Sequence, residues 1–114
     1  MADQPQIIQY DEFVKLDLRV ATILAAEPHP NADKLLVLQV DLGTEKRQIV
    51  AGIRAYYDAA TLVGRQIIVV KNLAPRMMRG LESQGMLLAA SSDDRTQVIF
   101  LTPEKPIGAG SKVS

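Results

Sequence analysis

The chain has 114 residues, contains no cysteine, and carries thirteen Lys and Arg against thirteen Asp and Glu, which gives a formal net charge of zero. This length fits one domain over residues 1–114, and the lack of cysteine excludes a disulfide framework, thiolate metal ligation and a cysteine nucleophile. No apolar run approaches the roughly 20 residues that cross a bilayer, and no secretory signal pattern opens the sequence, so we expect a cytoplasmic location without membrane contact.

The N-terminal region is expected to form an arm that leads into a strand. The first ten residues are mostly polar, but the apolar side chains of Ile7, Ile8 and Tyr10 interrupt them. Asp11 is placed to cap a short helix over residues 12–15. Apolar and polar residues then alternate over residues 16–20, which is the pattern of a half-buried strand. The alternation changes phase after Thr22 and so predicts a β-bulge that bends a long first strand.

Two further strands are predicted after a proline-containing loop. Residues 28–33 hold two prolines with Asn and Asp, which favour a loop over a strand. Alternation over residues 36–42 predicts the second strand, and a turn around Gly43 leads into a third strand at residues 46–51. Together, these three strands are expected to form an antiparallel meander.

The second half of the chain supplies one helical turn and two more strands. Asp58 is placed to cap a turn that ends at Gly64, and the continuous apolar run at residues 67–70 suits a strand covered on both faces. The remaining predicted elements are an irregular loop at 72–80, a strand at 86–90, a turn at 91–94, a strand at 98–101 and a loop-rich tail. This order predicts an all-β OB-fold, a five-stranded Greek-key barrel with one or two short helices and terminal extensions.

The sequence shows no constellation of catalytic residues. His29 is the only histidine; it lies between two prolines, where we expect an exposed loop side chain with no second histidine to share a metal. Ser83 lacks both the G-x-S-x-G elbow and an activating base. The scattered glycines form neither a phosphate-binding loop nor a dinucleotide fingerprint. We therefore expect no metal, no cofactor and no enzymatic activity.

A basic segment is the clearest sign of a ligand. No acidic residue lies between Asp58 and Glu82, and the cations of this segment are Arg65, Lys71, Arg76 and Arg79. The cations in the loop from Lys71 to Arg79 can contact phosphates, and a solvated cationic loop is the equally weighted alternative. Aromatic residues make up only 4% of the chain, so a base-stacking platform is weak and recognition of a folded RNA by shape and backbone is favoured.

Two pairs of neighbouring residues leave alternatives open. Met77 and Met78 would place adaptable thioethers on a base, a sugar or an apolar peptide if the loop exposes them, or beneath the barrel if it does not. They cannot easily both face inward in an extended segment. Tyr56 and Tyr57 are expected to be structural.

Four segments in the same order resemble the tRNA-binding domain of methionyl-tRNA synthetases. They are FVKLDLRV at residues 13–20, HPNADKL at 29–35, QIVAGI at 48–53 and SQGMLLAA at 83–90. That family includes C-terminal appendages of the synthetase, free-standing tRNA-binding proteins and the export-related chaperone CsaA. The resemblance runs from about residue 10 to residue 113, and the motif at 29–35 favours the synthetase-like branch over the chaperone branch.

The resemblance implies an OB-fold that dimerises through its end segments and binds the outer corner of tRNA without chemistry. The RNA-facing residues that it implies are Asn31, Lys34, Asn72, Arg76, Arg79, Ser83 and Met86. The loop after Asn72 commonly carries more lysine in the family, so phosphate affinity is expected to be lower here. Apolar groups expected to lie outside the barrel predict a homodimer interface of Ile7, Ile8, Tyr10, Ile107 and Val113.

Three functions remain as hypotheses. The first is a tRNA-binding homodimer, which resembles the free-standing form of the family. The second is a chaperone-like dimer that holds unfolded peptides on an apolar surface containing Met77 and Met78. The third is a structural subunit of a tRNA synthetase assembly. The expected partners are therefore tRNA, a second copy of the chain, and either a synthetase or unfolded peptides.

Overall fold

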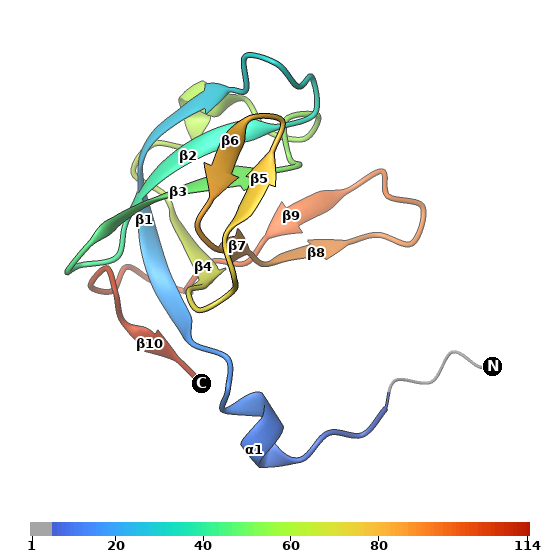
Figure 1. Ribbon diagram of the computed structural model, residues 1–114. Coiled ribbons are helices and arrows are strands. Elements are labelled where there is room, and N and C mark those ends of the chain that lie inside the picture. Colours follow the sequence, from blue (N-terminus) through green and yellow to red (C-terminus); the bar gives the residue numbers. More distant parts are fainter. Residues whose placement is uncertain (1–5) are drawn as a thin grey trace.

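The computed structural model describes residues 6–114, which form a strongly curved antiparallel sheet with short additions at both ends (Figure 1). The elements are α1 (Tyr10–Phe13), β1 (Leu18–Pro28), β2 (Leu36–Asp41), β3 (Lys46–Ala51), the 3-10 turn η1 (Ala59–Thr61), β4 (Gln66–Val70), β5 (Arg76–Met78), β6 (Leu81–Ser83), β7 (Met86–Leu87), β8 (Ala89–Ser91), β9 (Val98–Phe100) and β10 (Lys112–Val113). The main sheet has the order β3-β2-β1-β4-β7, and β10 adds to β1. This nearly closed barrel confirms the predicted all-β OB-fold. No helix in the described residues is long and apolar enough to cross a membrane.

The first strand is shared by the two halves of the barrel because it is long and bent. Its first part pairs with β4 over residues 18–22, and its second part pairs with β2 over residues 22–28. The pairing register shifts between Ile23 and Ala25, which confirms the predicted bulge. A bend at this point lets one continuous strand turn the corner of the barrel.

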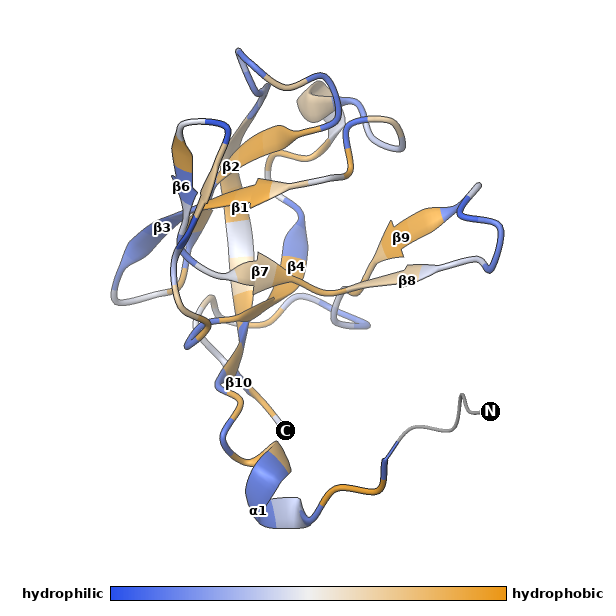
Figure 2. Cartoon of the chain, turned by 45° about the vertical axis from the view of Figure 1, so that its right-hand side comes forward, coloured by the Kyte–Doolittle hydropathy of each residue, from blue (hydrophilic) through white to orange (hydrophobic). Residues whose placement is uncertain are grey.

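The barrel strands are held together by two clusters of buried side chains. Strand β2, which contributes to the larger cluster, is coloured as strongly hydrophobic in Figure 2. Side chains of β2, β3 and β4 fill the main cluster, where Leu38, Val40 and Ile67 have no exposed surface. Ile68 and Val70 point to the opposite face of β4 and join a second cluster. Strand β4 is therefore covered on both faces, as its continuous apolar sequence predicted.

The second cluster packs against residues near both ends of the described part of the chain. It consists of Leu18, Val20, Ile68 and Val70, with Phe13, Leu88 and Val113 packed against it. The tail is loop-rich over residues 101–111, as predicted, but the expectation that Val113 lies outside the barrel was wrong, because Val113 pairs with Leu18 on β1. Gly110 explains how the tail comes so close, since a Cβ there would collide with the carbonyl of Leu42.

The predicted caps of the two helical turns had different outcomes. Asp58 caps η1 as expected, and its carboxylate accepts a hydrogen bond from the Ala60 N–H at 3.2 Å. Asp11 was expected to cap α1, but the helix starts two residues earlier, with Gln9 as its N-cap. The backbone N–H of Gln9 donates to Glu12 Oε1 at 3.0 Å, so the carboxylate that closes the first turn is that of Glu12.

The segment predicted as an irregular loop contains a hairpin instead. Strands β5 and β6 pair with Met78 opposite Leu81, which leaves the two-residue turn Arg79–Gly80. Both turn residues have positive φ, 55° and 93°, as a type I′ turn requires. The strand predicted at 86–90 is likewise divided, because β7 pairs with β4 whereas β8 leaves the barrel and pairs with β9.

Side chains close the barrel between β3 and the chain from β6 to β7. The amide of Gln84 joins this seam: its backbone N–H donates to the Gln48 carbonyl at 2.8 Å, and its Oε1 accepts from the Gln48 N–H at 3.0 Å. The hydroxyl of Ser83 accepts from the Val50 N–H at 2.9 Å. The two sides of the seam therefore meet through a backbone hydrogen bond, the Gln84 side-chain amide and the Ser83 hydroxyl, and not through a continuous strand ladder.

Candidate nucleic-acid interface

A buried histidine joins the β1–β2 loop to the β5–β6 hairpin. His29 is only 2% exposed, its Nδ1 lies 2.9 Å from the backbone N of Asn31, and its Nε2 lies 2.9 Å from the Met78 carbonyl oxygen. Because the Asn31 N–H must find an acceptor at Nδ1, the ring hydrogen is on Nε2 and is donated to Met78. The expectation that His29 is exposed was wrong, since both ring nitrogens have partners inside the protein and burial leaves neither unpaired.

Three of the implied RNA-facing residues gather around this junction. Arg79, at the tip of the hairpin, donates from Nη2 to the carbonyl oxygen of Asn31 at 3.2 Å. Arg79 also lines a shallow depression with Lys34 and Asp33, and both cations are exposed. The fold therefore brings Asn31 and Lys34 of one loop to Arg79 of the hairpin. Arg79 lies 48 positions beyond Asn31 in the chain.

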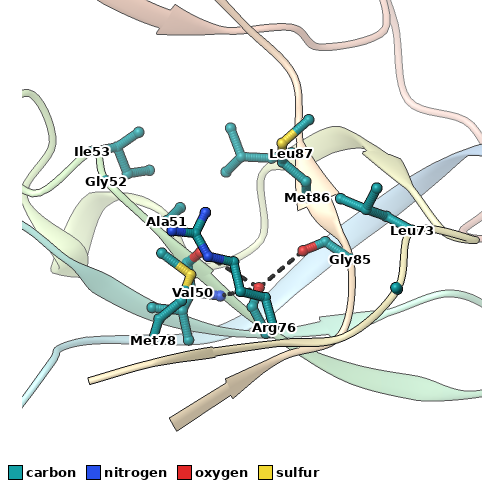
Figure 3. Close-up of a pocket in the computed structure, with 12 residues that line it drawn as sticks. Val50, Ala51, Gly52, Ile53, Leu73, Arg76, Met78, Gly85, Met86 and Leu87 are labelled. Carbon is teal, nitrogen blue, oxygen red and sulfur yellow. Dashed lines mark hydrogen bonds between the residues drawn. The ribbon is translucent and has the colours of Figure 1, made fainter. Parts of the chain in front are cut away.

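Arg76 and Met86 lie beside an apolar pocket of about 230 Å³ (Figure 3). Four segments line the pocket: the end of β3 with the two residues that follow it, the β4–β5 loop, β5, and residues 83–87. Arg76 is the one charged residue among the described residues that line it. Met78 faces this pocket, whereas Met77 is 64% exposed, so the two neighbouring thioethers point in different directions as the strand alternates.

Two other implied RNA-facing residues have their polar atoms engaged inside the protein. Ser83 is 4% exposed, and its hydroxyl donates to the Gly85 carbonyl at 2.9 Å besides accepting from β3. Asn72 donates from Nδ2 to the Lys15 carbonyl at 2.6 Å and accepts at Oδ1 from the Asp17 N–H at 2.8 Å. Their side chains position the barrel seam and the N-terminal segment.

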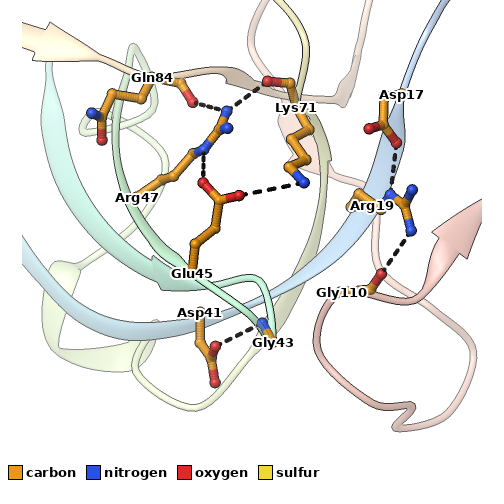
Figure 4. A network of polar contacts seen from close by, with 9 residues as sticks. All are labelled: Asp17, Arg19, Asp41, Gly43, Glu45, Arg47, Lys71, Gln84 and Gly110. Atoms are coloured by element: carbon orange, nitrogen blue, oxygen red, sulfur yellow. Dashed lines mark hydrogen bonds and ion pairs between the residues drawn. The ribbon is translucent and has the colours of Figure 1, made fainter.

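A cationic depression adjoins this region, and sequence reasoning missed part of it. Glu45 lies between two cations, 2.6 Å from Arg47 Nε and 3.4 Å from Lys71 Nζ (Figure 4). The hydrogen bond from the Arg47 guanidinium is the main reason why the pKa of the Glu45 carboxyl is lowered, and Lys71 adds to the effect. Arg47 also donates to the carbonyls of Lys71 at 2.6 Å and Gln84 at 3.3 Å. Lys46 lines the same depression and is exposed.

The fourth cation of the basic segment lies elsewhere. The guanidinium carbon of Arg65 is 4.7 Å from the ring centroid of Phe100 and 5.9 Å from that of Tyr57. The Tyr57 hydroxyl accepts from the Phe100 N–H at 3.3 Å, and its ring packs on the main core, so its predicted structural role is confirmed. Arg65 therefore stacks on core aromatic rings, outside the loop from Lys71 to Arg79 whose cations were expected to contact phosphates.

Comparison with known proteins identifies the family of this chain. The family model described as "Putative tRNA binding domain" matches residues 18–112. The chain belongs to this family of tRNA-binding domains. Among curated relatives, the methionine–tRNA ligase of Thermotoga maritima is 55% identical over 107 residues, which cover 94% of this chain and 17% of the ligase. The ligase of Thermococcus kodakarensis is 48% identical over 108 residues, 95% of this chain and 14% of that protein.

Solved structures of shorter proteins match this tRNA-binding domain over their whole length. A methionyl-tRNA synthetase-related protein from Pyrococcus horikoshii has a TM-score of 0.91 at 34% identity and covers 96% of this chain and 100% of its own. The chaperone CsaA from Bacillus anthracis has a TM-score of 0.86 at 29% identity, with coverage of 96% and 100%. The chain itself spans less than a fifth of the length of the ligases that it matches.

Proposed function

We propose that this tRNA-binding domain binds folded tRNA by its backbone and shape, that it performs no chemistry itself, and that it acts as a homodimer. The family match supports tRNA as the ligand class.

The arrangement of Lys34, Arg76 and Arg79 carries the proposal. These exposed cations lie on two segments that His29 fastens together, and none of them forms an ion pair within residues 6–114. Unpaired cations held at fixed positions can neutralise successive phosphates and release their counterions. Contacts of this kind fix the orientation of an RNA without distinguishing its sequence.

The environments of His29 and Ser83, the candidate base and the candidate nucleophile, support a non-catalytic role. Both ring nitrogens of His29 are engaged within the protein, so neither is free to accept a proton from a substrate. The Ser83 hydroxyl is buried, and it too is committed to backbone partners. His29 and Ser83 therefore stabilise the proposed binding surface through hydrogen bonds to the backbone.

A parallel titration tests the proposal. Filter binding with total tRNA and with an unfolded secretory precursor should show saturable binding of tRNA and weak or no binding of the precursor. If three phosphate contacts carry the affinity, the logarithm of the binding constant should fall with the logarithm of salt concentration with a slope of about −2 to −3. Failure to bind tRNA at low salt would contradict the proposal.

A peptide-holding function is the second candidate, and a specific observation favours it. The pocket beside Met78 and Met86 is lined mainly by apolar side chains, and the fold matches the chaperone CsaA at 29% identity. In that case, binding would be insensitive to salt and to loss of the arginines, but it would be lost on replacing Met77 and Met78. An association with a synthetase, which the ligase relatives suggest, would instead appear as copurification with that enzyme.

A further inference from the structure

The apolar pocket and the cationic depression are neighbours that share one wall. Leu73 and Ala74 of the β4–β5 loop line both of them. One side of this loop segment thus faces apolar side chains, and the other side faces the ends of β3 and β4. A ligand that crosses the segment meets two different chemical environments within the span of two residues.

The cationic depression suits an anion. Lys46, Arg47 and Lys71 line it against one carboxylate, that of Glu45, which leaves two positive charges in excess. Arg47 is held by Glu45 and by two backbone carbonyls. Lys46 has no ion pair in the described part of the chain, and its ammonium group remains available to a phosphate.

The apolar pocket suits a small flat group. Its 230 Å³ lies below the roughly 300–1,000 Å³ of sites that enclose drug-sized ligands, so it fits one base rather than a whole nucleotide. The thioethers of Met78 and Met86 can contact an aromatic ring favourably. No carboxylate belongs to its lining in residues 6–114.

We propose that these two depressions form a subsite for a single unstacked nucleotide of the bound RNA. Its base enters the apolar pocket between Met78 and Met86, and its phosphate lies over Lys46 and Lys71. This inference rests on the proposed function, because it places one nucleotide of the tRNA on the protein. Excess positive charge next to the pocket favours a nucleotide over an apolar peptide, and folded RNAs present unstacked bases in their loops and bulges.

Methionine methyl NMR tests the base contact on the unmodified protein. The chain is labelled at its methionine methyl groups, assigned by single Met→Leu variants, and titrated with total tRNA. An aromatic ring in the pocket should shift the methyl signals of Met78 and Met86 through its ring current. Met77, which is 64% exposed and points away, is the internal control and should stay nearly unchanged.

Filling the pocket tests its contribution to affinity. Ala74→Phe places a ring where the base would lie, and Ala60→Phe, at an exposed alanine of η1, is the matched control. Loss of one stacked base should weaken tRNA binding roughly 5- to 100-fold in the first variant, whereas the control should bind as the parent does. Lys46→Gln should also weaken binding, whereas Lys105→Gln, in a different depression, should not.

The outcomes separate this subsite from the proposed function. If the parent binds tRNA but neither pocket methyl shifts, the subsite is wrong and the function stands. If the parent does not bind tRNA, the proposed function fails and the subsite fails with it. Shifts of Met78 and Met86 with an unfolded polypeptide, but not with tRNA, would overturn the nucleotide assignment in favour of a peptide. The methyl experiment remains decisive even if Ala74→Phe fails to fold.

Discussion

At the scale of single residues, His29 links the two segments of the proposed binding surface. His29→Asn keeps an acceptor near Nδ1 for the Asn31 N–H, whereas His29→Gln keeps a donor near Nε2 for the Met78 carbonyl. Each variant loses one hydrogen bond, and we expect urea unfolding to show a loss of about 1–2 kcal/mol in stability. His29→Ala loses both bonds and should be the least stable of the three.

The two conservative variants should differ in tRNA affinity. His29→Gln preserves the bond to the hairpin and should bind closer to the parent than His29→Asn, because the hairpin carries the arginines. Filter binding measures this difference at a temperature where both variants are folded. Equal affinity of both variants and the parent would show that the junction supports the fold without positioning the RNA-binding residues.

The arginines of the hairpin carry the second prediction. Replacing both Arg76 and Arg79 by alanine should weaken the binding of all tRNAs about equally, since phosphate contacts carry no direct sequence information. The salt dependence of the binding constant should become shallower, with a slope smaller in magnitude by about 2. Folding should survive, because both side chains are exposed.

A charge-matched control accompanies that double variant. Lys105→Ala with Lys112→Ala removes the same charge at exposed positions of the tail and should leave the slope unchanged. A variant lacking both arginines that binds tRNA as tightly as the parent across the salt series would place the site elsewhere on the barrel.

At the scale of elements, the tip of the β5–β6 hairpin combines an unfavourable conformation with an exposed charge. Arg79 has a φ of 55°, a left-handed conformation that costs a residue such as arginine about 1 kcal/mol and that asparagine adopts more easily. We therefore expect Arg79→Asn to raise the midpoint of thermal unfolding slightly while it lowers tRNA affinity. A variant that gains stability and keeps full affinity would show that Arg79 has no binding role.

The ion pairs of Glu45 predict a pH dependence of stability. Arg47 and, to a smaller extent, Lys71 lower the pKa of this carboxyl, so its contribution is present above the unfolded pKa and is lost as the pH falls through the folded value. The stability difference between the parent and Glu45→Gln should therefore shrink as the pH falls below the ordinary value of 4.5. Urea midpoints measured across pH check this, with Glu104→Gln as the exposed control. A difference that stays constant with pH would contradict it.

The strands of the barrel could be predicted from the sequence, but the hairpin and the junction could not. Runs such as 36–41 and 66–70 carry their own apolar pattern, which depends only on neighbouring residues. Strands β5 and β6 have three residues each, and their turn is Arg-Gly rather than the usual Asn-Gly. The burial of His29 depends on a carbonyl 49 positions away, which no local pattern contains.

The candidate site shows the same limit. The density of cations between residues 58 and 82 pointed to Arg76 and Arg79, which the fold does place on one hairpin. It missed Lys46, which arrives from β3, because that residue lies outside the basic segment. Linear charge counts miss partners that the sheet brings together from different strands.

At the scale of the whole molecule, exposed apolar residues near the N-terminal end predict a dimer. Ile8 and Tyr10 are 55% and 77% exposed, and Val14 and Leu16 extend the same stretch. We expect light scattering at micromolar concentration to give twice the mass of the 12.5 kDa chain. Ile8→Asp with Tyr10→Asp should yield monomers, and Val63→Asp, at an exposed residue beside η1, should not. A monomeric parent would remove this proposal.

Helix α1 and strand β10 lie together at one end of the barrel. In both ribbon views, α1 and β10 are found on the side away from the β5–β6 hairpin (Figures 1 and 2), and Phe13 and Val113 pack on the same cluster. A body tethered after β10 would therefore lie opposite the hairpin and leave the cations of that hairpin open. If RNA binds at the hairpin as proposed, it would be held at high effective concentration for the tethered body, and the domain would add avidity without sharing any contact surface.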